Sequence, residues 1–191
     1  MRNIPNLLTL SRILMIPVFV SIYFFVGDWN HQAAALVFLL AAFTDWLDGY
    51  LARRLALVSP LGAFLDPVAD KLMVATALVM VVANNPQPWL AVSAAVIIGR
   101  EITISALREW MAEIGKRKKV AVSWIGKFKT VAQMTAITLL IYRHDLLGLP
   151  TYEIGTWLLY VAVVLTLWSM TVYLVAAWPS LSGKEKSQAG S

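Results

Sequence analysis

Six long apolar stretches, separated by short polar connections, run along almost the whole chain. Each stretch is long enough, at 1.5 Å per residue, to cross roughly 30 Å of hydrocarbon as an α-helix. The first stretch opens with a short amphipathic N-terminal element, and a Pro- and Asn-rich breaker at 84–88 is the clearest boundary. The pattern predicts an all-α integral membrane protein with six transmembrane helices. We place them at residues 5–26, 32–53, 61–83, 89–113, 124–142 and 152–178.

Composition supports this class. Hydrophobic residues make up 59% of the 191 residues and charged residues 14%, whereas soluble domains are nearer 45–50% and about 25%. We expect a single six-helix membrane domain over 1–178, followed by a disordered cytoplasmic tail at 179–191. The absence of Cys excludes disulfides and thiolate metal sites.

The basic residues lie mostly in the connections on one side of the predicted membrane. They include Arg53, Arg54 and the run at 116–119, whereas the opposite side has Arg143 alone. Lys and Arg are enriched in cytoplasmic loops, so both termini and the 54–60 connection are expected in the cytoplasm. The net charge of +5 therefore indicates membrane topology, and no nucleic-acid partner is expected.

Four aspartates interrupt the second and third apolar stretches. Asp45 and Asp48 are three residues apart, and Asp66 and Asp70 are four apart, so each pair lies on one helical face. The two helices are antiparallel and joined by a short connection. Counting residues from that connection places Asp48 and Asp66 at similar depth and Asp45 and Asp70 about one turn deeper, so that the four form a square near the cytoplasmic surface.

Such a cluster needs compensating charge, because ionised carboxylates in one pocket repel each other strongly. Two divalent cations would balance four negative charges, and an all-oxygen ligand set favours Mg²⁺ or Mn²⁺ over zinc. Two such ions are suited to phosphoryl displacement. The alternative is that these are topology charges or ion pairs, such as Asp48 with Arg53 or Asp66 with Lys71. Four acids outnumber what such local pairing needs.

The whole run from Asp45 to Asp70 fits the pattern Asp-x2-Asp-Gly-x2-Ala-Arg-x8-Gly-x3-Asp-x3-Asp. This run resembles the signature of the CDP-alcohol phosphotransferases, integral membrane enzymes of phospholipid synthesis. The resemblance implies that the four aspartates bind two metal ions and that Asp70 is also the catalytic base. It also implies a CDP-diacylglycerol site and, through the similar N-terminal element Pro5-Asn6-x-Leu8-Thr9-x2-Arg12, a set of contacts to that substrate. These contacts are Asn6, Thr9, Gly49, Ala52, Arg53 and Gly62. For Asn6 and Thr9, a helix-capping role is the alternative.

Three further segments, at 99–102, 107–110 and 122–130, resemble the bacterial members of this family that make phosphatidylglycerophosphate. The resemblance implies sn-glycerol 3-phosphate as the second substrate and a homodimer in the bacterial cytoplasmic membrane. With the topology above, the active site would face the cytoplasm, in contact with membrane lipid.

Basic residues on the cytoplasmic side offer a site for the acceptor phosphate. A Lys in the first turn of a helix opposes the macrodipole but can hold an anion together with the helix N-terminus. The alternative is topology or attraction to lipid headgroups, which we favour for the 116–119 run. Glu101 is expected to pair with a neighbouring cation. The candidate phosphate ligands are Arg100, Arg108, Lys127 and Lys129.

The sequence thus predicts transfer of a phosphatidyl group from CDP-diacylglycerol to sn-glycerol 3-phosphate, giving phosphatidylglycerophosphate and CMP. The nearest alternative keeps this chemistry with another acceptor: inositol phosphate, serine, a choline-type alcohol or phosphatidylglycerol. A divalent-cation transporter would need acids near the midplane and polar groups beyond them, but the outer halves of these helices are apolar. An intramembrane aspartyl protease would need two acids and leaves the other two unexplained.

Overall fold

The computed structural model is all-helical over its described residues, which are 4–25, 27–55, 60–115 and 124–182. Side chains are described for the same ranges except 4–8, 25, 48–55, 60–61, 63 and 124–127. This confirms the predicted fold class, an all-α protein with six long helices. The predicted tail lies mostly outside the described residues. The helices are α1 Ile4–Phe25, α2 Asn30–Leu55, α3 Pro60–Asn84, α4 Pro88–Glu113, α5 Trp124–Tyr142 and α6 Thr151–Leu181.

Proline and glycine mark several helix boundaries. Pro88 occupies the start of α4, where its missing N–H would have no helical partner. Past the end of α4, Gly115 has a φ of 73°, a left-handed conformation that glycine adopts without steric cost. Pro17 and Pro67 lie inside α1 and α3, so each of these helices lacks one backbone hydrogen bond.

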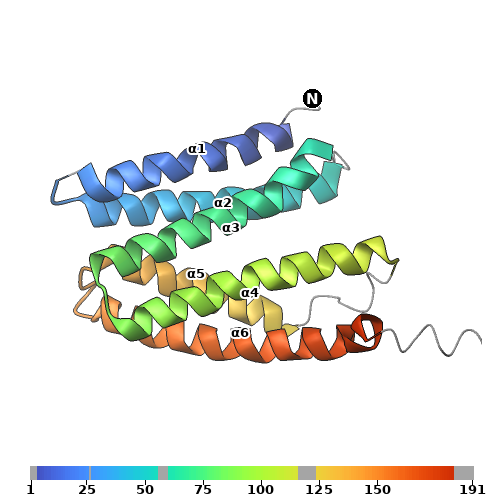
Figure 1. Ribbon diagram of the computed structural model, residues 1–191. Coiled ribbons are helices and arrows are strands. Elements are labelled where there is room, and N and C mark those ends of the chain that lie inside the picture. The colour runs from blue at the N-terminus through green and yellow to red at the C-terminus, as the bar shows by residue number, and fades with distance from the viewer. Residues whose placement is uncertain (1–3, 26, 56–59, 116–123, 183–191) are drawn as a thin grey trace, which may run out of the picture.

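The six helices lie side by side and alternate in direction (Figure 1). α1, α3 and α5 begin, and α2, α4 and α6 end, at the same end of the bundle, which we call the polar end. The opposite end, which we call the far end, holds the turns at 27–29, 85–87 and 143–150. The start of α1 and the end of α6 therefore both lie at the polar end, on opposite sides of the bundle.

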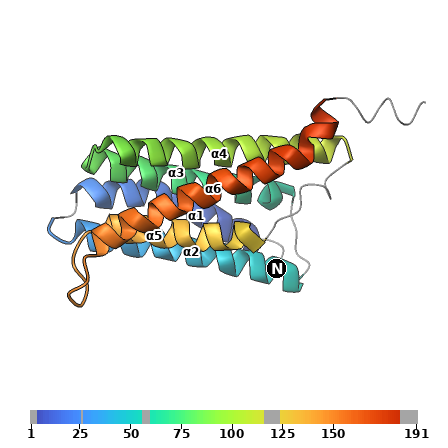
Figure 2. The same cartoon turned by 90° about the horizontal axis from the view of Figure 1, so that it is seen from below.

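The main hydrophobic core fills the half of the bundle towards the far end. Its large members, such as Phe38 and Ile137, are fully buried. α6 crosses α5 there (Figure 2), and Gly155 lies at their close approach. A Cβ at Gly155 would lie 2.9 Å from the Cβ of Leu139 and 3.2 Å from the carbonyl oxygen of Ala136. The two backbones can therefore pack this closely only with glycine at this position.

A second, smaller cluster joins α4 and α6 in the polar half. It contains Ile104, Leu107, Met111, Tyr173 and Ala177. This cluster fixes α6 against α4 and places Tyr173 beside the charged residues of α4.

The outer surface of the bundle carries many large apolar side chains. Trp157 is 71% exposed and Trp168 63% exposed on α6. Among the described helices, α4 and α6 are the two that are long and apolar enough to cross a membrane by length and hydropathy. An apolar exterior of this kind suits contact with lipid, consistent with an all-α membrane protein.

Candidate functional site

The aspartates lie on two helices that pack against α1 and against each other at the polar end. Asp45 is on α2, and Asp66 and Asp70 are on α3. Gly62, one turn before Asp66, is buried. The remaining predicted residues of this region lie outside the described side chains. These are Asn6, Asp48, Gly49, Ala52 and Arg53.

One face of α1 contacts both aspartate helices. An Nη1 atom of Arg12 lies 2.8 Å from Oδ1 of Asp45, and Arg12 is 1% exposed. The hydroxyl of Thr9, three residues earlier on the same face, donates a hydrogen bond to Oδ1 of Asp66. α1 therefore supplies a buried cation and a hydroxyl that orient carboxylates from two other helices. The family resemblance implied that Thr9 and the element ending at Arg12 lie at the nucleotide, and it predicted no contact between Arg12 and an aspartate.

Asp70 connects the aspartate region to the rest of the site. Its charge interacts unfavourably with Asp45 and Glu101 and favourably with Arg12 and Lys71. Its side chain is exposed and lines a cavity between α3, α4, α5 and α6. An exposed carboxylate in a cavity wall is accessible to a substrate.

The described aspartates offer the oxygen donors that Mg²⁺ and Mn²⁺ prefer, with no nitrogen or sulfur donor to favour zinc. Asp45 and Asp66 lie on helices that pack together. Among the side chains that the structure describes, no three acidic or histidine residues are close enough to hold one ion, and Asp48 is outside them. The donor chemistry therefore fits a hard divalent cation.

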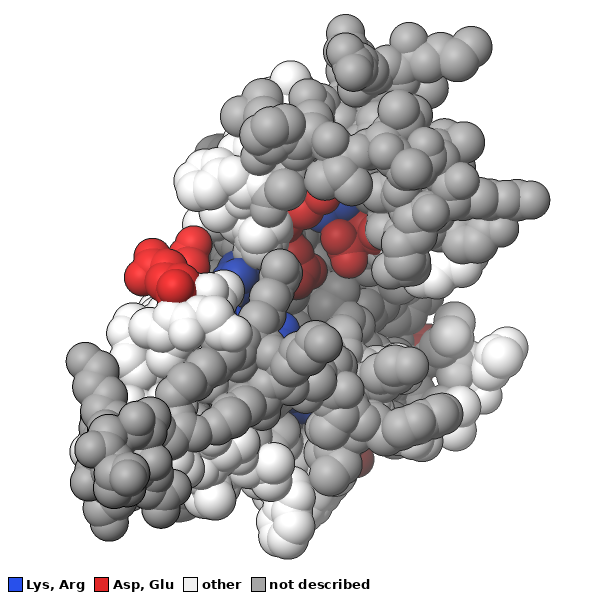
Figure 3. Space-filling model, turned by 90° about the vertical axis from the view of Figure 1, so that its right-hand side faces the viewer, with Lys and Arg blue, Asp and Glu red and all other residues white. Residues whose placement is uncertain are grey.

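The cavity has a volume of about 180 Å³. Figure 3 looks onto the polar end and shows acidic and basic side chains around a hollow there. The cavity is large enough for several waters at about 30 Å³ each, but smaller than the roughly 300–1,000 Å³ of drug-sized ligand sites. It suits a small polar molecule. Its lining is Asp70, Lys71, Val74, Arg100, Glu101, Arg108, Lys129, Thr130, Gln133, Met134 and Tyr173.

Two nearly buried cations contact one carboxylate in the wall of this cavity. Nη1 of Arg100 lies 3.0 Å from Oε1 of Glu101, and Nζ of Lys129 donates to the same oxygen. Nη2 of Arg100 also donates to the hydroxyl of Ser169 at 3.2 Å. Arg100 is 9% exposed and Lys129 2% exposed. The expectation that Glu101 pairs with a neighbouring cation is confirmed.

Tyr173 of α6 contacts a third basic residue of the cavity, Arg108. Nη2 of Arg108 donates to the Tyr173 hydroxyl at 3.0 Å, and its Cζ lies 5.3 Å from the ring centroid. Cζ of Arg100 lies 6.0 Å from the same centroid. One aromatic ring therefore positions both arginines, through cation–π attraction and one hydrogen bond. Tyr173 was not among the predicted site residues, although its polar group in an apolar helix was a usable signal.

Positive charge exceeds negative charge in this cavity. Four basic and two acidic side chains line it. Burying a cation without a balancing anion is unfavourable, because no attraction compensates for the free energy of removing its charge from water. A phosphate monoester carries about −1.5 to −2 at pH 7, which matches the excess of positive charge.

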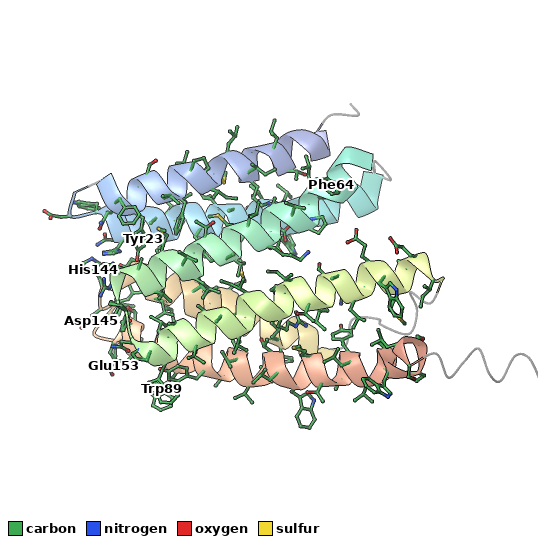
Figure 4. The ribbon with its side chains drawn as sticks, in the orientation of Figure 1. Tyr23, Phe64, Trp89, His144, Asp145 and Glu153 are labelled. Carbon is green, nitrogen blue, oxygen red and sulfur yellow. The ribbon has the colours of Figure 1, made fainter. Side chains whose placement is uncertain are left out.

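Three of the four predicted acceptor-phosphate residues, Arg100, Arg108 and Lys129, are brought together in this one cavity. The side chain of Lys127 lies outside the described residues. The histidines lie elsewhere: the rings of His31 and His144 are 6.3 Å apart, and Figure 4 shows His144 at the far end beside Tyr23. The two histidines therefore lie at the opposite end of the bundle from the aspartates.

Comparison with known proteins assigns the class. The family description "CDP-alcohol phosphatidyltransferase" matches residues 2–168, and the chain belongs to this family. The Escherichia coli K12 protein named CDP-diacylglycerol–glycerol-3-phosphate 3-phosphatidyltransferase is 54% identical over 175 residues, which are 92% of this chain and 94% of the relative. Proteins of the same name from Sodalis glossinidius and Shigella flexneri serotype 5b are 57% and 54% identical over the same shares.

Proposed function

We propose that the protein transfers the phosphatidyl group of CDP-diacylglycerol to sn-glycerol 3-phosphate, forming phosphatidylglycerophosphate and CMP. The observation that carries this proposal is the shared cavity, in which Asp70 of the aspartate stretch faces a wall rich in cations from α4 and α5. Two substrates can meet there, one at the aspartates and one at the cations. The printed names of the 54–57% identical relatives support the same pair of substrates.

The aspartate region is the proposed donor site. Asp45, Asp48, Asp66 and Asp70 would hold two divalent cations, Mg²⁺ or Mn²⁺. Bound ions would supply charge neutralisation at the pyrophosphate and at the departing CMP. The orienting contacts of Arg12 and Thr9 keep two of these carboxylates pointing into the space between α1, α2 and α3.

The cytidine and pyrophosphate would contact residues around this region. A guanidinium such as Arg53 presents a planar pair of donors suited to phosphate oxygens. Glycine and alanine at neighbouring positions leave room for the ligand's close approach. The full set that we propose is Asn6, Thr9, Gly49, Ala52, Arg53 and Gly62.

The cationic wall is the proposed acceptor site. Arg100 and Lys129 would bind the phosphate of glycerol 3-phosphate, with Arg108 and Lys127 adding positive charge. The excess positive charge favours a dianionic acceptor over serine or a choline-type alcohol. The volume of about 180 Å³ suits a small acceptor such as glycerol 3-phosphate. Glu101, which contacts both cations, balances them before the phosphate arrives.

The reaction needs one proton transfer and one displacement. Asp70 accepts the proton of the C1 hydroxyl of glycerol 3-phosphate. The oxygen then attacks the phosphorus that carries diacylglycerol, and the bond from that phosphorus to CMP breaks. Binding the acceptor phosphate at Arg100 and Lys129 holds its hydroxyl near Asp70, which converts the encounter into an intramolecular one.

This chemistry joins a lipid to a water-soluble ester, so the site must face both. We propose that the protein lies in the bacterial cytoplasmic membrane with its polar end towards the cytoplasm, where CDP-diacylglycerol keeps its acyl chains in lipid. The homodimer implied by the family resemblance belongs to the same proposal.

The proposed function is tested by CMP release from CDP-diacylglycerol by the purified protein with Mg²⁺ and single acceptors. The acceptors are sn-glycerol 3-phosphate, inositol phosphate, serine, choline and phosphatidylglycerol. We expect release with glycerol 3-phosphate alone. Release with another acceptor, and none with glycerol 3-phosphate, would overturn the acceptor assignment.

A further inference from the structure

The cavity contains one buried polar group that the proposed mechanism does not use. Gln133 lines the cavity from α5 and is 4% exposed. Its carboxamide oxygen Oε1 is buried and has no hydrogen-bond partner among the described residues. Leaving such an amide oxygen unpaired away from water is unfavourable by an amount similar to a lost hydrogen bond. A ligand that donates to Oε1 would remove this penalty.

The position of Gln133 relates it to both functional parts of the cavity. It lies four residues after Lys129, so the two side chains share one face of α5, with Cβ atoms about 5–6 Å apart. Asp70 and Val74 line the same cavity from α3. The cavity wall thus combines a phosphate-binding cation, a neutral amide one turn further along the helix, and the proposed base.

Glutamines in membrane helices often hydrogen-bond across to another helix. The Oε1 atom of Gln133 has no such partner in the described part of the chain. Met134, the next residue, and Val74 supply the apolar lining nearby. A buried amide oxygen that is left unpaired in the wall of a cavity points to a ligand.

We propose that Gln133 is a specificity residue whose Oε1 accepts a hydrogen bond from the secondary C2 hydroxyl of the acceptor. This inference rests on the proposed function. Glycerol 3-phosphate has three polar groups: its phosphate is assigned to Arg100 and Lys129, its C1 hydroxyl to Asp70, and its C2 hydroxyl lies between them. Of the two neutral hydrogen-bonding side chains that line the cavity from α5, Gln133 is buried, whereas Thr130 is exposed.

A site that hydrogen-bonds a substrate hydroxyl rejects an analogue that lacks it, because the buried polar group is then left unpaired. The matched analogue is 3-hydroxypropyl phosphate, which keeps the phosphate and the reacting hydroxyl and lacks only the C2 hydroxyl. We expect the wild-type protein to prefer glycerol 3-phosphate in kcat/KM by about 10- to 100-fold.

The test measures kcat/KM for both acceptors with the wild type, Gln133→Leu and Gln133→Met, at fixed CDP-diacylglycerol and Mg²⁺. We expect both variants to lose about 10- to 100-fold with glycerol 3-phosphate and less than about 3-fold with the analogue, so that the preference disappears. Thr135→Val, at an exposed position of the same helix, is the control and should keep the wild-type preference.

Two results would overturn the inference. One is equal use of both acceptors by the wild type, which needs no variant and holds even if both variants fail to fold. The other is an equal loss with both acceptors in a folded variant, which would indicate a packing role. Failure of the wild type to use either acceptor would instead overturn the proposed function.

Discussion

The two halves of this bundle differ in the side chains that fill the space between their helices. In the far half, helices meet through buried apolar side chains and a glycine contact, and Asn84 donates a hydrogen bond to the Tyr23 hydroxyl at 3.3 Å. In the polar half, cations and carboxylates occupy the space between the same helices. A charge cluster is a weak source of stability, because desolvation offsets its attraction. The far half therefore holds the fold together, and the polar half keeps charge available for substrates.

The largest expected effect is that of Asp70→Asn, which removes the proposed base and keeps the shape of the side chain. We expect kcat to fall by about 10³-fold or more, with no loss of thermal stability, because one of several like charges is removed. CMP release and the unfolding midpoint in detergent measure the two effects. Asp28→Asn, at an exposed turn of the far end, is the control. A fully active Asp70→Asn protein would reject Asp70 as the base.

Next in size is Lys129→Met, which keeps the length of the side chain and removes its charge. We expect kcat/KM for glycerol 3-phosphate to fall about 100-fold, mainly through KM, because a charge-assisted contact to phosphate is lost. Steady-state kinetics with varied acceptor measures this. Arg143→Gln removes a cation from the far end and should leave both constants near the wild-type values. An unchanged KM in Lys129→Met would place the acceptor phosphate elsewhere.

A substitution in the far half should instead lower the stability and leave the activity unchanged. In Gly155→Ala the new methyl group would meet Leu139 and Ala136 at 2.9 and 3.2 Å, so we expect destabilisation by about 1–3 kcal/mol. The kcat/KM of the folded fraction should be unchanged. Gly99→Ala is the matched control for stability, since nothing described lies within 4 Å of its added Cβ. Stability is measured by thermal unfolding. Equal stability of Gly155→Ala and Gly99→Ala would contradict the close packing of α5 and α6 at Gly155.

The smallest effect is expected for Tyr173→Phe. The ring that lies beside Arg100 and Arg108 remains, and only the hydroxyl that accepts from Arg108 is lost. Loss of one such hydrogen bond is worth about 1 kcal/mol, or roughly a 5-fold change in KM for glycerol 3-phosphate. Tyr173→Leu, which also removes the ring, should have the larger effect. Equal effects of the two variants would show that the ring itself does not position the arginines.

Much of this arrangement was predictable from the sequence, because its signals are local. Apolar runs predicted all six helices, and the spacing of Asp66 and Asp70 predicted their common face. The contacts between Arg12 and Asp45 and between Thr9 and Asp66 were not predicted, since each joins helices far apart in the sequence. The same holds for Ser169 and Tyr173, whose partners depend on how α6 crosses α4.

Charge in an apolar helix was nevertheless a usable signal. Glu101 was expected to pair with a cation on the evidence of its neighbours, and the structure shows it between Arg100 and Lys129. Arg12 carried the same signal, as a lone cation within an apolar stretch, and a carboxylate partner could have been inferred for it. Which carboxylate it meets depended on the packing of α1 against α2.

The central claim is that the carboxylates of the polar half hold divalent cations for phosphatidyl transfer. Its most direct test is equilibrium dialysis of Mn²⁺ against the purified wild type and Asp66→Asn, each with CDP present, with Asp28→Asn as the control. We predict two Mn²⁺ ions per chain for the wild type and the control, and fewer for Asp66→Asn. No binding by the wild type, or equal binding by all three proteins, would contradict the account.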